Sequence, residues 1–170
     1  MSDLTIRRAV PADAETLSEL GRDTFTETFG HLYPPEDLAA FLDGYHTPEA
    51  YLHYLRRDDC RLWIAKRDGR AVGYVLAGSC DLPHAEVTPQ CGELRRIYVR
   101  KSEQGSGLGG KLLTIALDWL HKPGRRLWIG VWSGNHGAQR LYQRHGFAKV
   151  GEYLFPVGET RDQEFILMRD

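Results

Sequence analysis

The run that decides the fold lies past the middle of the chain and reads Gln104-Gly105-Ser106-Gly107-Leu108-Gly109-Gly110-Lys111. It separates a segment of β-type residues at 92–99 from a segment with helical spacing of apolar residues at 108–120. Glycines let such a loop bring successive backbone N–H groups close to a phosphate at the positive end of the helix. The run therefore predicts a site for a phosphate-bearing ligand.

Two nucleotide-binding motifs overlap this loop, and each lacks the residue that does its chemistry. The glycines have the G-x-G-x-x-G spacing of a dinucleotide fingerprint, but the next predicted strand, at 127–132, ends without an acid for the ribose. The run up to Lys111 approaches a P-loop, but Leu112 stands where a hydroxyl should hold Mg²⁺. A nucleotide-binding protein is an alternative that both gaps argue against.

The remaining sequence predicts an α/β fold with a mixed sheet and helices on both faces. Period-2 or short apolar segments predict strands at 4–10, 61–67, 70–78, 92–99, 127–132, 147–155 and 163–169. The dipeptide Asp68-Gly69 predicts a tight hairpin between the second and third strands. Helical spacing predicts two or three helices between residues 12 and 57, and others at 108–120 and 135–145.

Composition narrows the class of protein. The 170 residues suit one domain, 1–170, and the formal net charge of −1 argues against nucleic acid as a partner. The three cysteines have no CxxC spacing, so we expect neither a disulfide framework nor a metal site. No stretch approaches the ~20 apolar residues of a membrane span, and we expect a cytoplasmic protein that does not bind membranes.

Three blocks of sequence carry a resemblance to a known family. The first is Glu93-Leu94-Arg95-Arg96-Ile97-Tyr98-Val99 and the second is Gln104-x-x-Gly107-x-Gly109. The third is Asn135-x-x-Ala138-x-x-Leu141-Tyr142-x-x-x-Gly146-Phe147. In this order, with the predicted strand and helices among them, they resemble the GNAT superfamily of N-acetyltransferases. The resemblance implies a largely antiparallel sheet of about seven strands, splayed between strands 4 and 5. It also implies transfer of an acetyl group from acetyl-CoA to a primary amine in a ternary complex.

The resemblance assigns most of these residues to acetyl-CoA. Pantetheine would pair with the backbone of Ile97, Tyr98 and Val99, and Asn135 would contact the same arm as well as capping its helix. The pyrophosphate would lie against the main chain of the loop: Gln104, Gly105, Ser106, Gly107, Leu108, Gly109 and Gly110. Lys111 either assists with phosphate charge or is a solvated helix residue.

Two residues are candidates for proton transfer. By resemblance, Tyr142 donates a proton to the departing thiolate; otherwise it is an aromatic packed under the sheet. An alkylammonium of pKa ~10 must lose a proton before it can attack. Glu93 occupies the position where many family members keep a catalytic glutamate, but ordered water is an alternative base. Otherwise, Glu93 is a strand-end carboxylate paired with Arg95 or Arg96.

The amine acceptor is the least determined part. Thr26-Glu27-Thr28-Phe29-Gly30 and Glu36-Asp37-Leu38-x-x-Phe41-Leu42 loosely resemble a bacterial branch that includes spermidine and spermine acetyltransferases. We therefore expect a polyamine or another small amine, with Glu27, Phe29, Tyr33 and Glu36 as candidate contacts. A protein or peptide amino group and a non-catalytic acyl-CoA-binding regulator are alternatives. Relatives also imply a homodimer through the C-terminal strands. The scattered histidines His31, His46 and His53 are expected at the surface or in loops.

Overall fold

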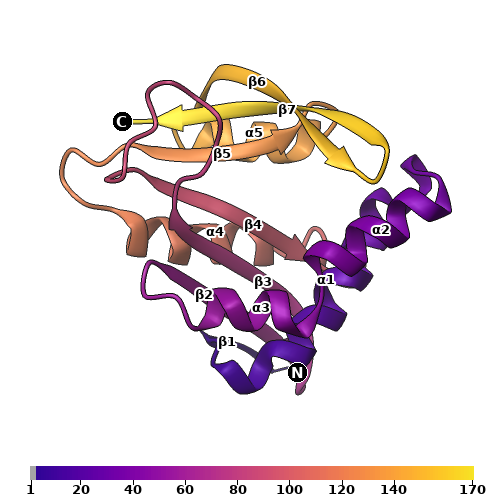
Figure 1. Cartoon of the computed structure of the whole chain (residues 1–170). Helices are drawn as coiled ribbons and strands as arrows, with labels where there is room; N and C mark the ends of the chain where they lie inside the picture. Colours follow the sequence, from indigo (N-terminus) through magenta and orange to yellow (C-terminus); the bar gives the residue numbers. More distant parts are fainter. Residues whose placement is uncertain (1–2) are drawn as a thin grey trace.

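The protein, seen in a computed structural model that describes residues 3–170, is built on a seven-stranded sheet. The strands are β1 Leu4–Arg8, β2 Cys60–Arg67, β3 Arg70–Ser79, β4 Gly92–Val99, β5 Leu127–Trp132, β6 Ala148–Val157 and β7 Thr160–Arg169. They lie in the order β1-β2-β3-β4-β5-β7-β6 (Figure 1). Only β4 and β5 run parallel; the other neighbouring pairs are antiparallel. The mixed, largely antiparallel sheet expected from the sequence is confirmed.

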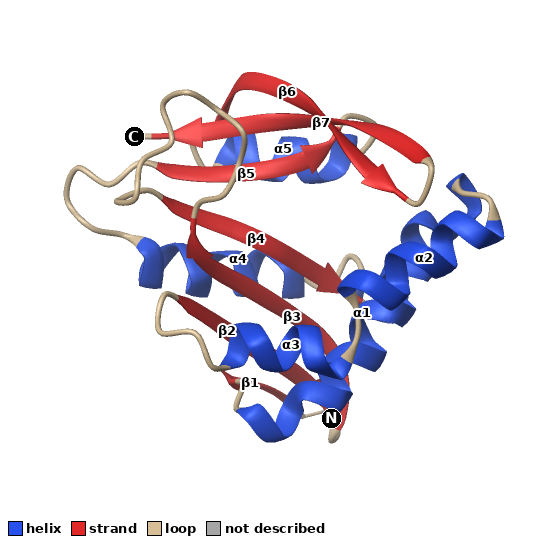
Figure 2. Ribbon diagram, in the orientation of Figure 1, coloured by secondary structure: helices blue, strands red, loops and turns tan. Residues whose placement is uncertain are grey.

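Helices cover both faces of this sheet, as predicted (Figure 2). They are α1 Ala14–Phe29, α2 Pro35–Tyr45, α3 Pro48–Leu55, α4 Leu108–Leu120 and α5 His136–Arg144. On one face, α4 buries Leu112 and Leu113 in the cluster that holds Ile129 of β5. On the other face, Leu17 of α1 and Tyr51 of α3 are buried in the cluster that covers β2 and β3. Each cluster packs helices against one face of the sheet.

Local signals in the sequence set several element boundaries. Asp68 and Gly69 both have positive φ, 51° and 82°, as the two-residue hairpin between β2 and β3 requires. The side chain of Thr47 accepts a hydrogen bond from the backbone N–H of Ala50 at 3.1 Å and caps α3. Gly146, with φ 89°, ends the last helix in the left-handed conformation.

The last hairpin differs from the expected one. The strands were expected to stop at 155 and resume at 163, but they continue to Val157 and from Thr160, joined by a two-residue turn. The polar residues of this segment hid its strand character, because pairing with a partner strand, not local alternation, holds it extended. Pro156 is tolerated because β6 is the edge strand of the sheet. The homodimer expected through these strands stays a prediction.

A buried acid ties α2 to this hairpin. The carboxylate of Asp37 accepts hydrogen bonds from the backbone N–H of Glu159 at 3.0 Å and from the hydroxyl of Thr160 at 2.6 Å. Both carboxylate oxygens of Asp37 are therefore engaged by the β6–β7 turn. Figure 2 shows α2 reaching toward that turn.

His46 corrects another expectation. It lies in the connection between α2 and α3, as predicted, but its side chain is wholly buried and not at the surface. Its Nδ1 lies 2.7 Å from the hydroxyl of Tyr51, which in turn lies 2.6 Å from the hydroxyl of Tyr74. Burial, with Arg96 and Arg22 nearby, lowers the pKa of His46 to about 3. The ring is therefore neutral and belongs to the packing behind β4.

Candidate functional site

The sheet opens between its two parallel strands. Only Gly92, Glu93 and Leu94 of β4 pair with β5, and the pairing ends at Ile129. Beyond that level β4 continues through Ile97, Tyr98 and Val99, bonded to β3 on one side and without a strand partner on the other. Figure 1 shows the two strands diverging toward α1. The backbone expected to pair with pantetheine thus forms a free strand edge.

The glycine loop is shaped to receive an anion. Gly105 and Gly107 have φ of 84° and 86°, and Gly107 immediately precedes α4. Within residues 3–170, the backbone N–H groups of Gly105, Gly107 and Gly109 donate to no acceptor. A Cβ built on any of these glycines, or on Gly110, would meet no atom within 4 Å. Open space, free N–H groups and a helix N-terminus together fit a pyrophosphate.

Helix α5 brings Asn135 and Tyr142 to the opening. The side-chain oxygen of Asn135 accepts from the N–H of Ala138 at 3.2 Å, so the expected N-cap is present. Two helical turns further along, Tyr142 is buried in the same apolar cluster as Leu112 and Leu113 of α4. Asn135 and Tyr142 line the same cavity. Burial and the neighbouring Tyr98 raise the pKa of Tyr142. Its phenol is therefore protonated and able to donate.

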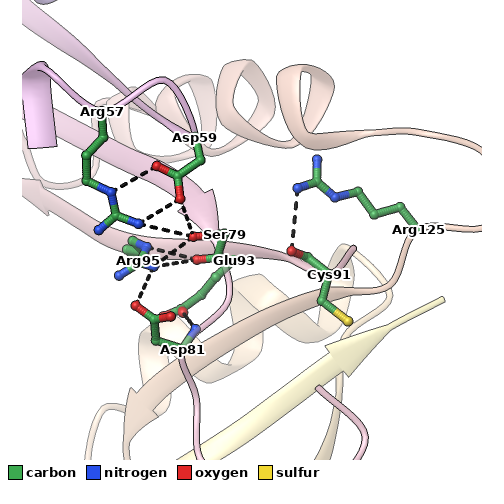
Figure 3. A network of polar contacts seen from close by, with 8 residues as sticks. All are labelled: Arg57, Asp59, Ser79, Asp81, Cys91, Glu93, Arg95 and Arg125. Atoms are coloured by element: carbon green, nitrogen blue, oxygen red, sulfur yellow. Dashed lines mark hydrogen bonds and ion pairs between the residues drawn. The ribbon is translucent and has the colours of Figure 1, made fainter. Parts of the chain in front are cut away.

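Glu93 lies at the closed end of the opening, in a network of polar groups (Figure 3). Its Oε1 accepts a hydrogen bond from the backbone N–H of Asp81 at 3.0 Å. The alternative to a catalytic role was an ion pair of Glu93 with Arg95 or Arg96. Among residues 3–170, Glu93 forms neither ion pair. Burial raises the pKa of Glu93, and the hydrogen bond from Asp81 opposes this shift. A buried carboxylate with a raised pKa is suited to accept a proton.

A cavity of about 280 Å³ joins these groups to the α1–α2 side of the sheet. Glu93, Tyr142 and Asn135 line it together with aromatic side chains from the helices and strands. Ring contacts build the aromatic wall: Phe25 lies 4.5 Å from Phe41 between ring centroids.

The four candidate acceptor contacts divide into two pairs. Phe29 and Tyr33 line the cavity, and the hydroxyl of Tyr33 hydrogen-bonds the carboxylate of Asp162. Glu27 does not line it; its carboxylate accepts from the backbone N–H of Lys101 at 3.0 Å, beside the end of β4. Glu36 is exposed at the start of α2 and does not line the cavity either. Glu27 and Glu36, the two acids predicted to contact the acceptor, therefore do not line the cavity.

Several charged residues of the cavity were not found from sequence. Asp162 and Glu164 of β7 and Arg96 of β4 line it. Oε2 of Glu164 is buried and has no hydrogen-bond partner within residues 3–170. Burial, with Asp162 nearby, raises the pKa of Glu164 to about 7. The sequence shows that Glu164 and Phe165 point to opposite faces of a strand. It does not show which of the two faces is buried.

Comparison with known proteins agrees with this geometry. Residues 16–147 match the model of the Acetyltransferase (GNAT) family. The "Uncharacterized N-acetyltransferase in pepI 3′region" of Lactobacillus delbrueckii subsp. lactis is 31% identical over 173 residues, covering 99% of this chain and 98% of that protein. This chain belongs to the GNAT family. It is accordingly an N-acetyltransferase with acetyl-CoA as co-substrate, which displaces the nucleotide-binding alternative.

Two further similarities extend the picture of this GNAT protein. The "Probable spermine N(1)-acetyltransferase" of Bacillus subtilis subsp. natto is 30% identical over 135 residues, covering 71% of this chain and 87% of that protein. The PaiA N-acetyltransferase of Thermoplasma acidophilum, solved in complex with coenzyme A, has a TM-score of 0.78 at 21% identity and 99% coverage of both chains. At this low identity, the similarity to the Thermoplasma acidophilum protein shows that the two chains share a fold.

The structure also bears on metals and membranes. Within residues 3–170, no three His, Cys, Asp or Glu side chains gather in a way that could hold a metal ion. None of the helices in that range combines the length and apolar character needed to cross a bilayer.

Proposed function

We propose that this protein transfers the acetyl group of acetyl-CoA directly to a small primary amine, with both substrates bound at once. The observation that carries the proposal is the single opening between β4 and β5. The glycine loop and Tyr142 approach it from the α4–α5 side of the sheet, and the aromatic cavity approaches it from the α1–α2 side. Two ligands entering from opposite faces would meet there.

Residues of the chain can supply both proton transfers. Glu93 accepts a proton from the ammonium of the acceptor and leaves a neutral amine. The amine nitrogen forms a bond to the acetyl carbon while the bond from that carbon to sulfur breaks. Tyr142 donates its proton to the departing sulfur, so free CoA leaves as a thiol. The raised pKa values of both side chains suit these directions of transfer.

The size of the cavity favours a small acceptor over a protein. At about 280 Å³ it is near the lower end for small-ligand pockets, and aromatic side chains close it on the helix side. Polyamines belong in the first set of acceptors to test, because a relative at 30% identity is named as a spermine acetyltransferase. Amino acids, simple amines and a short peptide complete the set.

Release of free thiol from acetyl-CoA tests the proposal. We expect release that depends on a small amine, accompanied by the acetylated amine in equal amount. Release with the peptide alone would favour a protein acceptor. Tight binding of CoA without turnover of any amine would contradict the transferase function and favour a regulator.

A further inference from the structure

Two adjacent arginines of β4 point to the same side of the sheet. Leu76 of β3 pairs with Arg96 and the next residue pairs with Leu94, so Arg95 is an extra residue in a bulge. A bulge turns two neighbouring side chains toward one face. Both guanidinium groups accordingly lie over the ring of Tyr54, at 6.0 Å for Arg95 and 5.4 Å for Arg96. Both residues line the acceptor cavity, but their surroundings differ.

Arg95 is occupied by protein partners. Its guanidinium donates to the backbone oxygen of Ser79 at 2.6 and 3.0 Å and to the carboxylate of Asp81 at 2.7 Å. Figure 3 shows this side chain enclosed by the polar network around Ser79. Its charge is balanced within the protein, which leaves little for a ligand.

Arg96 has no such balance. Its guanidinium faces the rings of Tyr51 and Tyr54 at 5.7 and 5.4 Å. It makes a long hydrogen bond, 3.5 Å, to the backbone oxygen of Tyr45, lies beside the hydroxyl of Tyr51, and forms no ion pair with any carboxylate in residues 3–170. A guanidinium is always charged and carries five N–H donors, and a partly buried charge without a counter-ion is costly. Arg96 therefore presents a positive charge with free donors to the cavity.

The opposite wall of the cavity carries the complementary charge. Glu164 pairs with Trp132 at the far end of β5, so it lies across the opening from the unpaired part of β4. The buried oxygen of Glu164 lacks a partner, as described above. The cavity thus combines an unpaired cation from β4 with an unpaired carboxylate from β7. A ligand that carries both an ammonium and an anionic group would satisfy both.

We propose that Arg96 binds a carboxylate of the acceptor, and that the acceptors of this enzyme are amino-acid-like: small molecules with a primary amine and a carboxylate. Arg96 can bind a carboxylate through two parallel N–H···O bonds, while Glu93 and Glu164 surround the amine. A polyamine would bring an additional positive charge into the same cavity as Arg96. The inference rests on the proposed transfer reaction and names its substrate class.

Matched acceptor pairs test the inference on the unmodified protein. Each pair is an amino acid and the amine left when its carboxylate is removed, for example lysine and 1,5-diaminopentane. We expect kcat/KM to be about tenfold or more higher for the carboxylated member, as a charge-assisted bidentate contact would give. Equal or higher kcat/KM for the decarboxylated members, or for spermine over all amino acids, would overturn it.

Variants assign the preference to Arg96. In Arg96→Gln the preference should fall to near unity through a raised KM for the carboxylated member, and Arg96→Lys should restore part of it. Arg161→Gln is the control for loss of positive charge, because Arg161 is exposed and donates only to backbone oxygens of its own turn. An equal loss for both members of a pair would assign Arg96 to packing alone and contradict the inference.

Thermal unfolding separates this inference from the proposed reaction. In the presence of CoA, carboxylated amines should raise the Tm of the wild-type protein and not that of Arg96→Gln, since a ligand of the native state stabilises it. If that shift appears without any turnover, the substrate class stands and the transfer reaction fails. If decarboxylated amines raise Tm equally, or if neither member does, the role of Arg96 is refuted.

Discussion

Tyr142 is packed in the core of the protein and lines the cavity at the opening between β4 and β5. The side chain is buried, and its raised pKa keeps the phenol protonated. We predict that Tyr142→Phe lowers kcat by about 100-fold, in the usual range for loss of a general acid. The KM for acetyl-CoA should change little, because the ring and its packing remain. Steady-state kinetics at saturating amine measures both, and a kcat equal to wild type would remove Tyr142 from the acid role.

Glu164 should make the stability of the fold depend on pH. Its pKa is about 7 in the fold against an ordinary value of 4.5, so between these values the folded state keeps a proton that the unfolded chain has lost. Its contribution to stability is therefore fully present below pH 4.5 and is lost as the pH rises toward 7. Glu164→Gln should be more stable than wild type at pH 8, by on the order of 2 kcal/mol, and similar to it at pH 4.

Urea unfolding at the two pH values measures this difference. Glu159→Gln serves as the control, because Glu159 is exposed in the neighbouring turn. A Glu164→Gln variant that is equally destabilised at both pH values would show that the carboxylate makes a favourable contact in the fold. It would also remove the argument that Glu164 is kept for a ligand.

Among single residues, those of the glycine loop and of α5 were found from the sequence, but several charged residues of the cavity were not. Tyr142 follows Asn135 by seven residues, so helical period alone put them on one face. Arg96 could not be distinguished from Arg95, because the bulge that turns both to one side depends on pairing with β3. The side of the sheet that Glu164 faces depends on its register against Trp132 of β5 and Tyr153 of β6, which the sequence does not specify.

The glycine loop before α4 depends on a glycine in the left-handed conformation. Gly107 has φ of 86°, where alanine costs about 1–2 kcal/mol. We predict that Gly107→Ala loses this stability and also raises the KM for acetyl-CoA about tenfold, because the methyl group would occupy space needed by a phosphate. Gly124→Ala is a matched control: Gly124 has φ of 75° and equally open surroundings, but lies beyond the other end of α4. The same rise in KM for both variants would mean that backbone strain alone is responsible.

Helix α2 is fixed to the β6–β7 turn by Asp37. Removing the carboxylate of Asp37 breaks its hydrogen bonds to Glu159 and Thr160 and loosens the helix side of the cavity. Asp37→Ala should therefore raise the KM for the amine severalfold and leave the KM for acetyl-CoA unchanged. Asp43→Ala, an exposed acid on the same helix, is the control. Parallel increases in both KM values would contradict a role confined to the acceptor side.

Elements with a strong local signal were predicted well, and those set by pairing were not. The apolar residues of α4 recur on one face, and the helix runs over the residues expected. The strands β6 and β7 extend further than predicted because Thr160, Arg161 and Asp162 have no apolar alternation and are held by their partners. The splay of β4 from β5 followed from resemblance to a family, since no local pattern specifies where two parallel strands part.

At the scale of the whole molecule, the fold keeps two binding regions apart and joins them at one opening. In the proposed function, the free edge of β4 and the glycine loop bind acetyl-CoA, and the aromatic cavity on the other face binds the acceptor. This arrangement requires no residue to carry the acetyl group between them. Both substrates must then be present before either product leaves.

Initial rates measured over a grid of acetyl-CoA and acceptor concentrations test this central claim most directly. The acceptor is whichever amine of the panel gives the highest kcat/KM, and the acetylated amine and free thiol are both quantified. We predict double-reciprocal lines that intersect, with one acetylated amine formed for each thiol released. Parallel lines together with an acetylated form of the protein, or thiol release without acetylated amine, would contradict direct transfer in a ternary complex.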